Sequence, residues 1–385
     1  MTRRRADVLI TGGGTAGHVY PALAIAEALV KRGHDRAGVQ FVGARRGLER
    51  TLVPPSGFPM RLLPGRGFVR SMSAKNLLAL GGLGVAFVEA LGLVLRARPA
   101  VVVAVGGYGG VACGLAAVVL RIPVVTVNVD AVPGAANRLV GRFAASSAVA
   151  RAGSGLRHEI VTGVPVRDAA LQADRSASGR AEARRALGLP AERAIVAVVG
   201  GSLGASRLNR AALGLRCILA ERDDLLIYHV SGQRDYETLR AAVDTEPPGR
   251  LDYRLVAFEE QLPALFAAAD LVVSRAGAMT VAELGAIGTP AILVPLPGAP
   301  SDHQSENART LEGRGAAILV PDGAATANEL AALLTDLLAD RPRLEAMGER
   351  AHSPANREAA GAIAALVDDV AASGRRAREG HGARP

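Results

Sequence analysis

Polar residues between positions 274 and 308 have the types and spacing expected of a site for a phosphorylated sugar. The apolar run 271–273 enters a small polar turn and then an Ala- and Leu-rich segment that carries Thr280 and Glu283. A strand that ends in such a turn at a helix start presents free N–H groups and the positive end of the helix dipole to an anion. A second helix start follows at residues 301–307. We interpret this stretch as half of a nucleotide-sugar site.

A second candidate site lies near the N-terminus, where residues 7–11 are typical of a buried strand and residues 21–32 of a helix. The intervening glycines, 12–17, let the backbone approach a ligand closely, which suits a diphosphate. His18 follows, with a pKa range useful for accepting a proton from a sugar hydroxyl. Two interpretations stay open for it: a catalytic base, or a histidine that only hydrogen-bonds or contacts phosphate.

This glycine turn lacks a partner that a nicotinamide dinucleotide needs. After the next strand, 39–42, the chain continues with residues 43–47, Gly-Ala-Arg-Arg-Gly, and has no Asp or Glu to bind a ribose. The turn therefore favours a different phosphorylated ligand.

The elements that position these residues alternate between strands and helices. Further strands are predicted at residues 101–105, 124–127, 194–199, 226–230, 255–258 and 291–294, and glycine-rich turns follow at 106–110 and 200–205. This alternation predicts parallel sheets covered on both faces. The 385 residues have room for two domains, so we expect an α/β protein with two Rossmann-like, doubly wound domains that face a cleft.

The net charge of +9 is weak evidence for a nucleic-acid partner. Much of it comes from the two ends, through Arg3, Arg4 and Arg5 and through residues 375–384. Aromatic residues make up 3% of the chain and there is no Trp, so no platform for base stacking is expected. The basic ends are interpreted either as solvated tails or as attraction to anionic lipid or phosphate.

Residues 77–95 form an apolar stretch about long enough to cross a bilayer. Glu89 lies inside it and glycines interrupt it, which favours a core helix or a surface patch resting on a membrane, flanked by Arg66, Arg70 and Lys75. Cys113 and Cys217 show no metal-binding spacing and are interpreted as buried free thiols in a reducing compartment. No signal peptide is recognised, so we expect a cytoplasmic protein.

Motifs in order along the chain carry a resemblance to a known family. They are Gly13-Gly14-Thr15-x-Gly17-His18-x-x-Pro21, Gly106-Gly107-Tyr108, Gly163-x-Pro165-Val166-Arg167, Gly200-Gly201-Ser202-x-Gly204-Ala205, Arg275-x-Gly277-Ala278-x-Thr280-x-x-Glu283 and His303-Gln304-x-x-Asn307-Ala308. Together they resemble the MurG family of peptidoglycan glycosyltransferases, which have the GT-B fold. The resemblance covers about residues 7–365.

The resemblance implies an inverting, metal-independent enzyme that moves GlcNAc from UDP-GlcNAc to the C4 hydroxyl of lipid-linked MurNAc-pentapeptide, converting lipid I into lipid II. The implied partners are UDP-GlcNAc, the undecaprenyl-linked muramoyl-pentapeptide and the anionic inner leaflet, with no nucleic acid and no cofactor. The implied location is the cytoplasmic face of the membrane, as a peripheral protein. Alternatives are a paralogue with another acceptor, a non-catalytic UDP-sugar or lipid-intermediate binding protein and, more weakly, a sugar epimerase.

The resemblance also implies roles for single residues. His18 would be the catalytic base, Glu283 would bind the ribose hydroxyls, and Gln304 with Asn307 would face the donor sugar. The other implied donor-binding residues are Thr15, Arg167, Ser202, Phe258, Gly277, Ala278, Met279 and Thr280. The acceptor and its diphosphate are implied to meet Gly13, Gly14, Gly17, Gly107, Tyr108, Asp130 and Asn137. No metal ligands are expected, since the chain has no Asp-x-Asp motif.

In this family the first domain, expected at residues 1–164, binds the acceptor and faces the membrane, and the second, expected at 165–344, binds the UDP-sugar. A last helix, at about 345–370, is implied to pack back on the first domain, with Ser353-Pro354 as a plausible break. We expect a disordered basic tail at 373–385.

The chain departs from the family at one loop. Where the family has His-Glu-Gln-Asn, this chain has Val127-Asn128-Val129-Asp130. The change removes a His and a Glu from a loop that contacts donor sugar and supports acceptor chemistry in the family. Asp130 is the carboxylate that could serve in their place.

Overall fold

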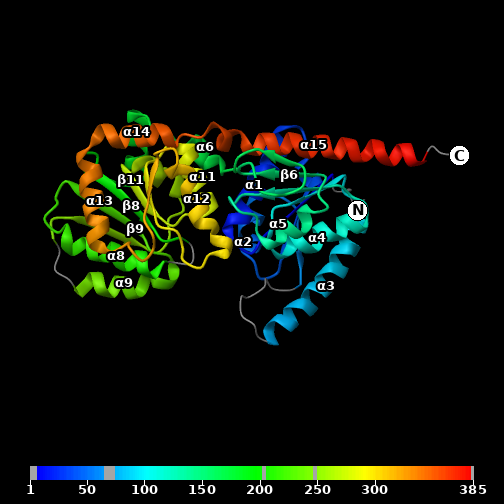
Figure 1. The fold of residues 1–385 in the computed structure, drawn as a ribbon, viewed down its shortest axis with the longest axis horizontal. Coiled ribbons are helices and arrows are strands. Elements are labelled where there is room, and N and C mark those ends of the chain that lie inside the picture. Colours follow the sequence, from blue (N-terminus) through cyan, green and yellow to red (C-terminus); the bar gives the residue numbers. More distant parts are fainter. Residues whose placement is uncertain (1–6, 65–73, 202–204, 246–248, 383–385) are drawn as a thin grey trace. The chain divides into compact units, whose positions relative to one another are not determined.

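The structure is a computed structural model that describes residues 7–64, 74–201, 205–245 and 249–382. The chain divides into two compact units (Figure 1). Unit 1 combines Met1–Arg167 with Ala355–Pro385, and unit 2 is Asp168–Pro354. Each unit is built on its own sheet.

Unit 1 contains a parallel sheet in the order β3-β2-β1-β4-β5-β6-β7. Its strands are β1 (Val8–Thr11), β2 (Val39–Ala44), β3 (Met60–Leu63), β4 (Val101–Ala104), β5 (Val124–Asn128), β6 (Ser146–Val149) and β7 (Glu159–Val161). The central strands β1, β4 and β5 are buried along their whole length. Their runs of Val, Leu and Ile fit this position, because a central parallel strand is covered on both faces.

Most helices of unit 1 lie between these strands in the sequence (Figure 1). The helices are α1 (Ala16–Lys31), α2 (Glu49–Leu52), α3 (Ala74–Ala97), α4 (Gly107–Val119), α5 (Ala135–Gly141) and α15 (Pro354–Gly382), with short 3-10 turns at Arg36–Gly38 and Pro54–Ser56. On the face formed by α3 and α4, Ala86, Ala90 and Val94 pack with Ala112 and Ala116. Small residues on both helices allow this close packing.

The last helix, α15, belongs to unit 1 although it is the end of the chain. Asp368 accepts hydrogen bonds from Arg32 Nε (2.7 Å) and pairs with His34 Nε2 (2.7 Å), both just beyond α1. Near its start, Asn356 Oδ1 accepts the N–H of Val164 (3.1 Å). These contacts attach α15 to the segment that follows α1 and to the segment that follows β7.

Unit 2 contains a second parallel sheet, in the order β10-β9-β8-β11-β12-β13. Its strands are β8 (Ala194–Val199), β9 (Leu225–Val230), β10 (Asp252–Val256), β11 (Leu271–Ser274), β12 (Ala291–Leu293) and β13 (Ala317–Leu319). Its helices are α6 (Asp168–Gln172), α7 (Ala177–Ala186), α8 (Ser206–Ile218), α9 (Gln233–Thr245), α10 (Leu262–Ala268), α11 (Ala278–Ile287), α12 (His303–Glu312), α13 (Ala327–Ala339) and α14 (Arg341–Ala351), with a 3-10 turn at Pro300–Asp302. Leu208 and Leu215 of α8 pack with Leu330 and Leu334 of α13 over one face of the sheet.

The two predicted parallel α/β domains are confirmed. The chain leaves unit 1 after Arg167 and returns at Ala355, next to the Ser353-Pro354 step. Helix α14 lies in unit 2, so the returning segment begins at α15 and not near residue 345. The helix α15 continues to Gly382, whereas the sequence predicts disorder from residue 373.

Helix α3 contains the apolar stretch that the sequence analysis singled out. Val85, Val88 and Leu95 are exposed, while Ala86, Ala90 and Val94 on the same helix are fully buried. Throughout the described ranges, no helix combines the length and the apolar character that a bilayer crossing requires.

Candidate active site

The glycine turns of unit 1 meet where the strand order of its sheet reverses. The β1–α1 turn and the β4–α4 turn leave neighbouring strands, and the helices that follow belong to opposite directions of winding. In open α/β sheets, ligands bind outside the carboxyl ends of the strands at this point. Gly13, Gly14, Gly17 and Gly107 all lie there.

The two turns fit against each other through their glycines. Gly107 has a positive φ of 74°, and a Cβ added to it would overlap the carbonyl oxygen of Gly13. Gly106, with a φ of 102°, faces the imidazole of His18, and a Cβ there would lie 3.1 Å from His18 Cδ2 and Nε2. Both positions therefore need glycine for conformation and for space.

His18 lies in the first turn of α1 and is half-buried. Its Nδ1 is 3.1 Å from the hydroxyl of Thr15, the N-cap residue. Burial lowers the pKa of His18, while Asp130, a hydrogen bond to the Gly13 backbone and Glu49 raise it, in that order. An imidazole that stays neutral and lies within the field of two carboxylates has the character of a base.

The loop that departs from the family pattern adjoins this histidine. Asn137 of α5 is buried and donates from Nδ2 to the Val127 carbonyl and to Asn128 Oδ1, both at 3.1 Å. Asn128 in turn donates to the Asp130 carbonyl at 2.6 Å. The amides of Asn137 and Asn128 thus shape the loop, and the carboxylate of Asp130 is the group of this loop whose charge acts on His18.

Tyr108 and Arg167 are two further residues of unit 1 that the sequence analysis names as site residues. Tyr108 is buried, and burial raises the pKa of its phenol. Arg167 belongs to unit 1, and its guanidinium lies 4.6 Å from the ring centre of Tyr20 on α1. The role of Arg167 in donor binding stays a prediction.

In unit 2 the predicted phosphate turn also lies at a reversal of strand order, between β8 and β11. Gly277 is the N-cap of α11 and has no capping side chain. The N–H groups of Ala278, Met279 and Thr280 therefore have no partner within the helix, and these residues are partly exposed. An uncapped helix start with the positive dipole end is suited to bind a diphosphate.

Arg275 holds this turn in place through contacts of its buried side chain. Its Nη1 donates to the carbonyls of Val294 and Pro295, each at 3.1 Å, and pairs with Asp322 at 2.7 Å. The side chain is 10% exposed. Because its charge is already matched by Asp322, Arg275 acts as a support for the turn.

The predicted sugar-binding amides both bind backbone. Asn307 is buried and donates to the Ala276 carbonyl at 3.2 Å, next to the phosphate turn. Gln304 Oε1 accepts the N–H of Leu296 at 2.9 Å, which leaves the amide NH2 group to donate elsewhere. Glu283, in the middle of α11, is 2% exposed.

Phe258 and Ser202 complete the predicted set. Strand β10 ends at Val256, so Phe258 lies in the following loop, where its side chain is 54% exposed. Ser202 lies outside the described residues. Next to Gly200, Asn209 donates to the Ser231 carbonyl at 2.9 Å and binds His229 Nε2 at 3.1 Å.

Sequence reasoning missed two carboxylates that organise the units. Glu49 is 1% exposed and accepts the N–H of Gly14 at 2.7 Å. This bond takes one of the N–H groups that the sequence assigns to a diphosphate. Asp270 lies just before β11 and binds three arginines of unit 2. A Glu or Asp without a neighbouring motif gives no signal for either role.

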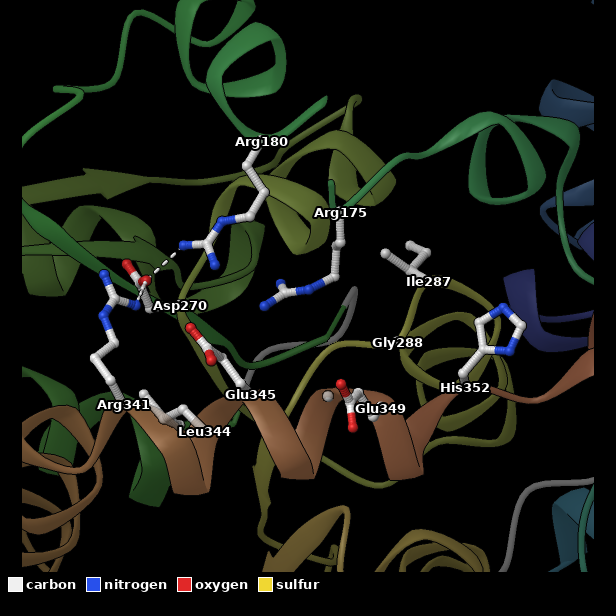
Figure 2. A pocket seen from close by; sticks show the side chains of 11 residues that line it. Arg175, Arg180, Asp270, Ile287, Gly288, Arg341, Leu344, Glu345, Glu349 and His352 are labelled. Atoms are coloured by element: carbon white, nitrogen blue, oxygen red, sulfur yellow. Dashed lines mark hydrogen bonds and ion pairs between the residues drawn. The ribbon is translucent and has the colours of Figure 1, made fainter. Parts of the chain in front are cut away.

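A cavity of about 580 Å³ lies beside Asp270, and Figure 2 shows the side chains that line it. Arg175, Arg180 and Arg341 line it, together with Glu345 and Glu349 of α14. Asp270 precedes β11, whereas the phosphate turn follows it, so the cavity is at the amino edge of the sheet. It is therefore separate from the predicted substrate residues of unit 2.

Residues 8–149 match the N-terminal domain of glycosyltransferase family 28, and residues 195–364 match its C-terminal domain. The chain belongs to glycosyltransferase family 28. It is a glycosyltransferase, and the predicted resemblance to the MurG family is confirmed.

Two curated relatives carry the name UDP-N-acetylglucosamine–N-acetylmuramyl-(pentapeptide) pyrophosphoryl-undecaprenol N-acetylglucosamine transferase. The one from Rhodococcus opacus is 40% identical and covers 97% of this chain and 98% of the relative. The one from Desulforudis audaxviator is 38% identical and covers 96% of this chain and all of the relative. The crystal structure of MurG from Acinetobacter baumannii matches with a TM-score of 0.74 and 29% identity, over 94% of this chain and 99% of that one.

Proposed function

We propose that this family member transfers GlcNAc from UDP-GlcNAc to the C4 hydroxyl of lipid-linked MurNAc-pentapeptide, which converts lipid I into lipid II. The observation that carries the proposal is the near full-length match to transferases named for this sugar and this acceptor. The grouping of predicted site residues at the strand-order reversal of each sheet supports it.

Unit 2 binds the donor in this proposal. The uncapped start of α11 receives the diphosphate through the N–H groups of Ala278, Met279 and Thr280. Glu283 binds the ribose hydroxyls, and the NH2 group of Gln304 donates to the sugar. Asn307 and Arg275 hold the turn rigid, which preserves the alignment of its N–H groups.

Unit 1 supplies the base. The C4 oxygen of the muramoyl sugar attacks C1 of GlcNAc from the face opposite UDP, and His18 takes the hydroxyl proton as the new C–O bond forms. The bond from C1 to the diphosphate breaks with inversion, and its electrons leave with UDP. The α11 start stabilises the departing charge, so the step runs without a metal ion.

Helix α3 provides the membrane contact in the proposal. Val85, Val88 and Leu95 expose 55%, 67% and 51% of their surfaces, whereas Ala86, Ala90 and Val94 of the same helix are buried. Arg96 and Arg98 follow at its end. Apolar side chains beside basic ones suit the interface of an anionic bilayer and place the enzyme peripherally at the inner leaflet.

Transfer of radiolabel from UDP-GlcNAc to a lipid-linked muramoyl acceptor tests the proposal. The wild-type chain is expected to form the disaccharide lipid, also in the presence of a chelator. His18→Asn is expected to lose about 10²- to 10⁴-fold in kcat and to bind UDP as the wild type does. Tight UDP binding without transfer in the wild type would support a non-catalytic binding protein instead, and a chelator-sensitive rate would contradict metal independence.

A transferase for another acceptor is the second candidate. The observation that favours it is the loop with Val127 and Asn128, whose side chains are buried and structural here. Competition between the muramoyl lipid and other lipid-linked sugars at limiting donor distinguishes the two candidates, because the true acceptor has the higher kcat/KM.

A further inference from the structure

Glu49 is a buried carboxylate of unit 1 that the proposed mechanism leaves unused. It is the first residue of the short helix α2, and its side chain joins two loops at the carboxyl edge of the sheet. Oε1 accepts the N–H of Ala44 at 2.6 Å, at the end of β2. Oε2 accepts the N–H of Gly14 at 2.7 Å, in the turn after β1. The carboxylate therefore links the β1–α1 turn to the β2–α2 loop.

Three glycines enclose this carboxylate. A Cβ added to Gly13, Gly43 or Gly47 would overlap the carboxyl group of Glu49. The two loops thus wrap closely around the side chain, and its exposed fraction is 1%. A charge held in such a place is weakly screened, so it acts strongly on groups nearby.

The peptide unit between Gly13 and Gly14 connects this carboxylate to His18. Its N–H, from Gly14, donates to Glu49. The Gly13 backbone also forms a hydrogen bond that raises the pKa of His18. A partner that raises the pKa of an imidazole is an acceptor, and the backbone acceptor of Gly13 is its carbonyl.

We propose that Glu49 is a positioning residue for His18, because it fixes and polarises the Gly13–Gly14 peptide unit whose carbonyl holds the imidazole. The interlocked glycines support this arrangement, since Gly107 packs on the Gly13 carbonyl and Gly106 packs on the imidazole. Hydrogen bonds in such a chain strengthen one another. The peptide unit thereby selects one tautomer of His18, as a carboxylate does in a direct pair.

The inference rests on the proposed role of His18 as the base. The groups that act on this imidazole are Thr15 on its own helix, the Gly13 backbone, Asp130 after β5 and Glu49 on α2. Both carboxylates stabilise the imidazolium that forms when the base takes its proton. Loss of the Glu49 charge therefore lowers the pKa of His18, and the neutral form persists to lower pH as a weaker base.

Glu49→Gln is the test variant, because it keeps the shape but can no longer accept from both N–H groups. Glu159→Gln is the matched control. Glu159 also accepts two backbone N–H groups, from Gly153 at 2.8 Å and Ser154 at 3.0 Å, but at β7. The readouts are the pH profile of kcat, the KM for UDP-GlcNAc and the pKa of His18 by NMR of the full chain, assigned with His18→Asn.

We expect Glu49→Gln to lower kcat by about 10- to 100-fold, as loss of an orienting partner does elsewhere, with the KM for UDP-GlcNAc unchanged. In Glu49→Gln, the acidic limb of the kcat profile and the pKa of His18 measured by NMR should both move to lower pH. In Glu159→Gln, both should stay at their wild-type values. A folded Glu49→Gln protein with wild-type kcat and wild-type His18 pKa overturns the inference. If the wild type transfers no sugar, the proposed function fails, and the NMR titration still tests the coupling.

A measurement on the unaltered chain decides the matter if Glu49→Gln does not fold. The ¹⁵N shifts of His18 report which ring nitrogen carries the proton. One tautomer is expected, with its N–H directed to Gly13. An equilibrium mixture of both tautomers contradicts the inference.

Discussion

Replacement of Asp270 by Asn tests how unit 2 is held together. The Asp270 side chain is fully buried. Its Oδ1 accepts from Arg180 Nη2 at 2.5 Å and from Arg341 Nη1 at 2.6 Å (Figure 2). Its Oδ2 accepts from Arg184 Nη2 at 2.9 Å and from the Ile195 N–H at 2.7 Å. One carboxylate thus ties α7 and α14 to the amino edge of the sheet.

The size of the effect follows from how exposed each partner is. The side chains of Arg184 and Arg180 are 11% and 22% exposed, so without Asp270 they remain as poorly hydrated charges. Breaking a buried ion pair in this way costs about 3–5 kcal/mol. Arg341 is 57% exposed, and its pair contributes at most about 1 kcal/mol. We therefore expect Asp270→Asn to be far more destabilising than Arg341→Met.

The same carboxylate makes unit 2 sensitive to acid. Burial raises the pKa of Asp270, but Arg180, the Ile195 N–H and Arg341 together outweigh burial, and the pKa lies below the ordinary 3.8. The group therefore stabilises the fold fully above about pH 4, and the contribution is lost as pH falls through the lower, folded-state pKa. Asp270→Asn should flatten the pH dependence of stability in this acidic range.

Urea unfolding followed by circular dichroism measures the free energy of unfolding of the wild type, Asp270→Asn and Arg341→Met. Hydrogen exchange then assigns any loss to peptides of unit 2. The reasoning is refuted if Asp270→Asn loses less than about 1 kcal/mol, which is the range of a surface pair. It is also refuted if Arg341→Met costs as much as Asp270→Asn.

Three further predictions concern the site and the membrane surface. Asp130→Asn should lower the pKa of His18 and move the acidic limb of the kcat profile to lower pH; an unchanged limb refutes the coupling. Gly107→Ala should reduce the rate of transfer by at least about 10²-fold through misplacement of the base, while UDP binding persists. Gly134→Ala is the control and should leave the rate unchanged, because Gly134 lies in open space at a φ of −68°. Val88→Asp should weaken binding to anionic vesicles in a flotation assay, without loss of transfer to a detergent-solubilised acceptor; equal binding contradicts the role of α3.

The central strands could be predicted from the sequence because they are covered on both faces. Residues 101–104 and 271–273 are uninterrupted apolar runs that lead directly into glycine turns. The edge strands β3 and β7 gave no such signal. In β7, Ile160 and Val161 are 44% and 55% exposed, and three residues are too few to show a period.

The candidate site could be predicted only as far as its local turns. Residue types and spacing place His18 and Gly277 at helix starts, because the strand, turn and helix are consecutive. The partners that orient them come from elsewhere in the chain, since Glu49 reaches Gly14 across 35 positions. Asn307 likewise reaches Ala276 across 31 positions. Such pairs depend on the order of strands in the sheet, which the spacing of motifs does not specify.

The return of α15 to unit 1 has a consequence for synthesis on the ribosome. Unit 2 is continuous in sequence, so all of its residues are available once Pro354 has left the exit tunnel. Unit 1 is completed last, because Asp368 must be translated before it can bind Arg32 and His34, which are made first. The nascent chain must therefore keep its earliest domain unfinished until the end of translation, and a premature stop near codon 354 would leave the later domain whole and the earlier one incomplete.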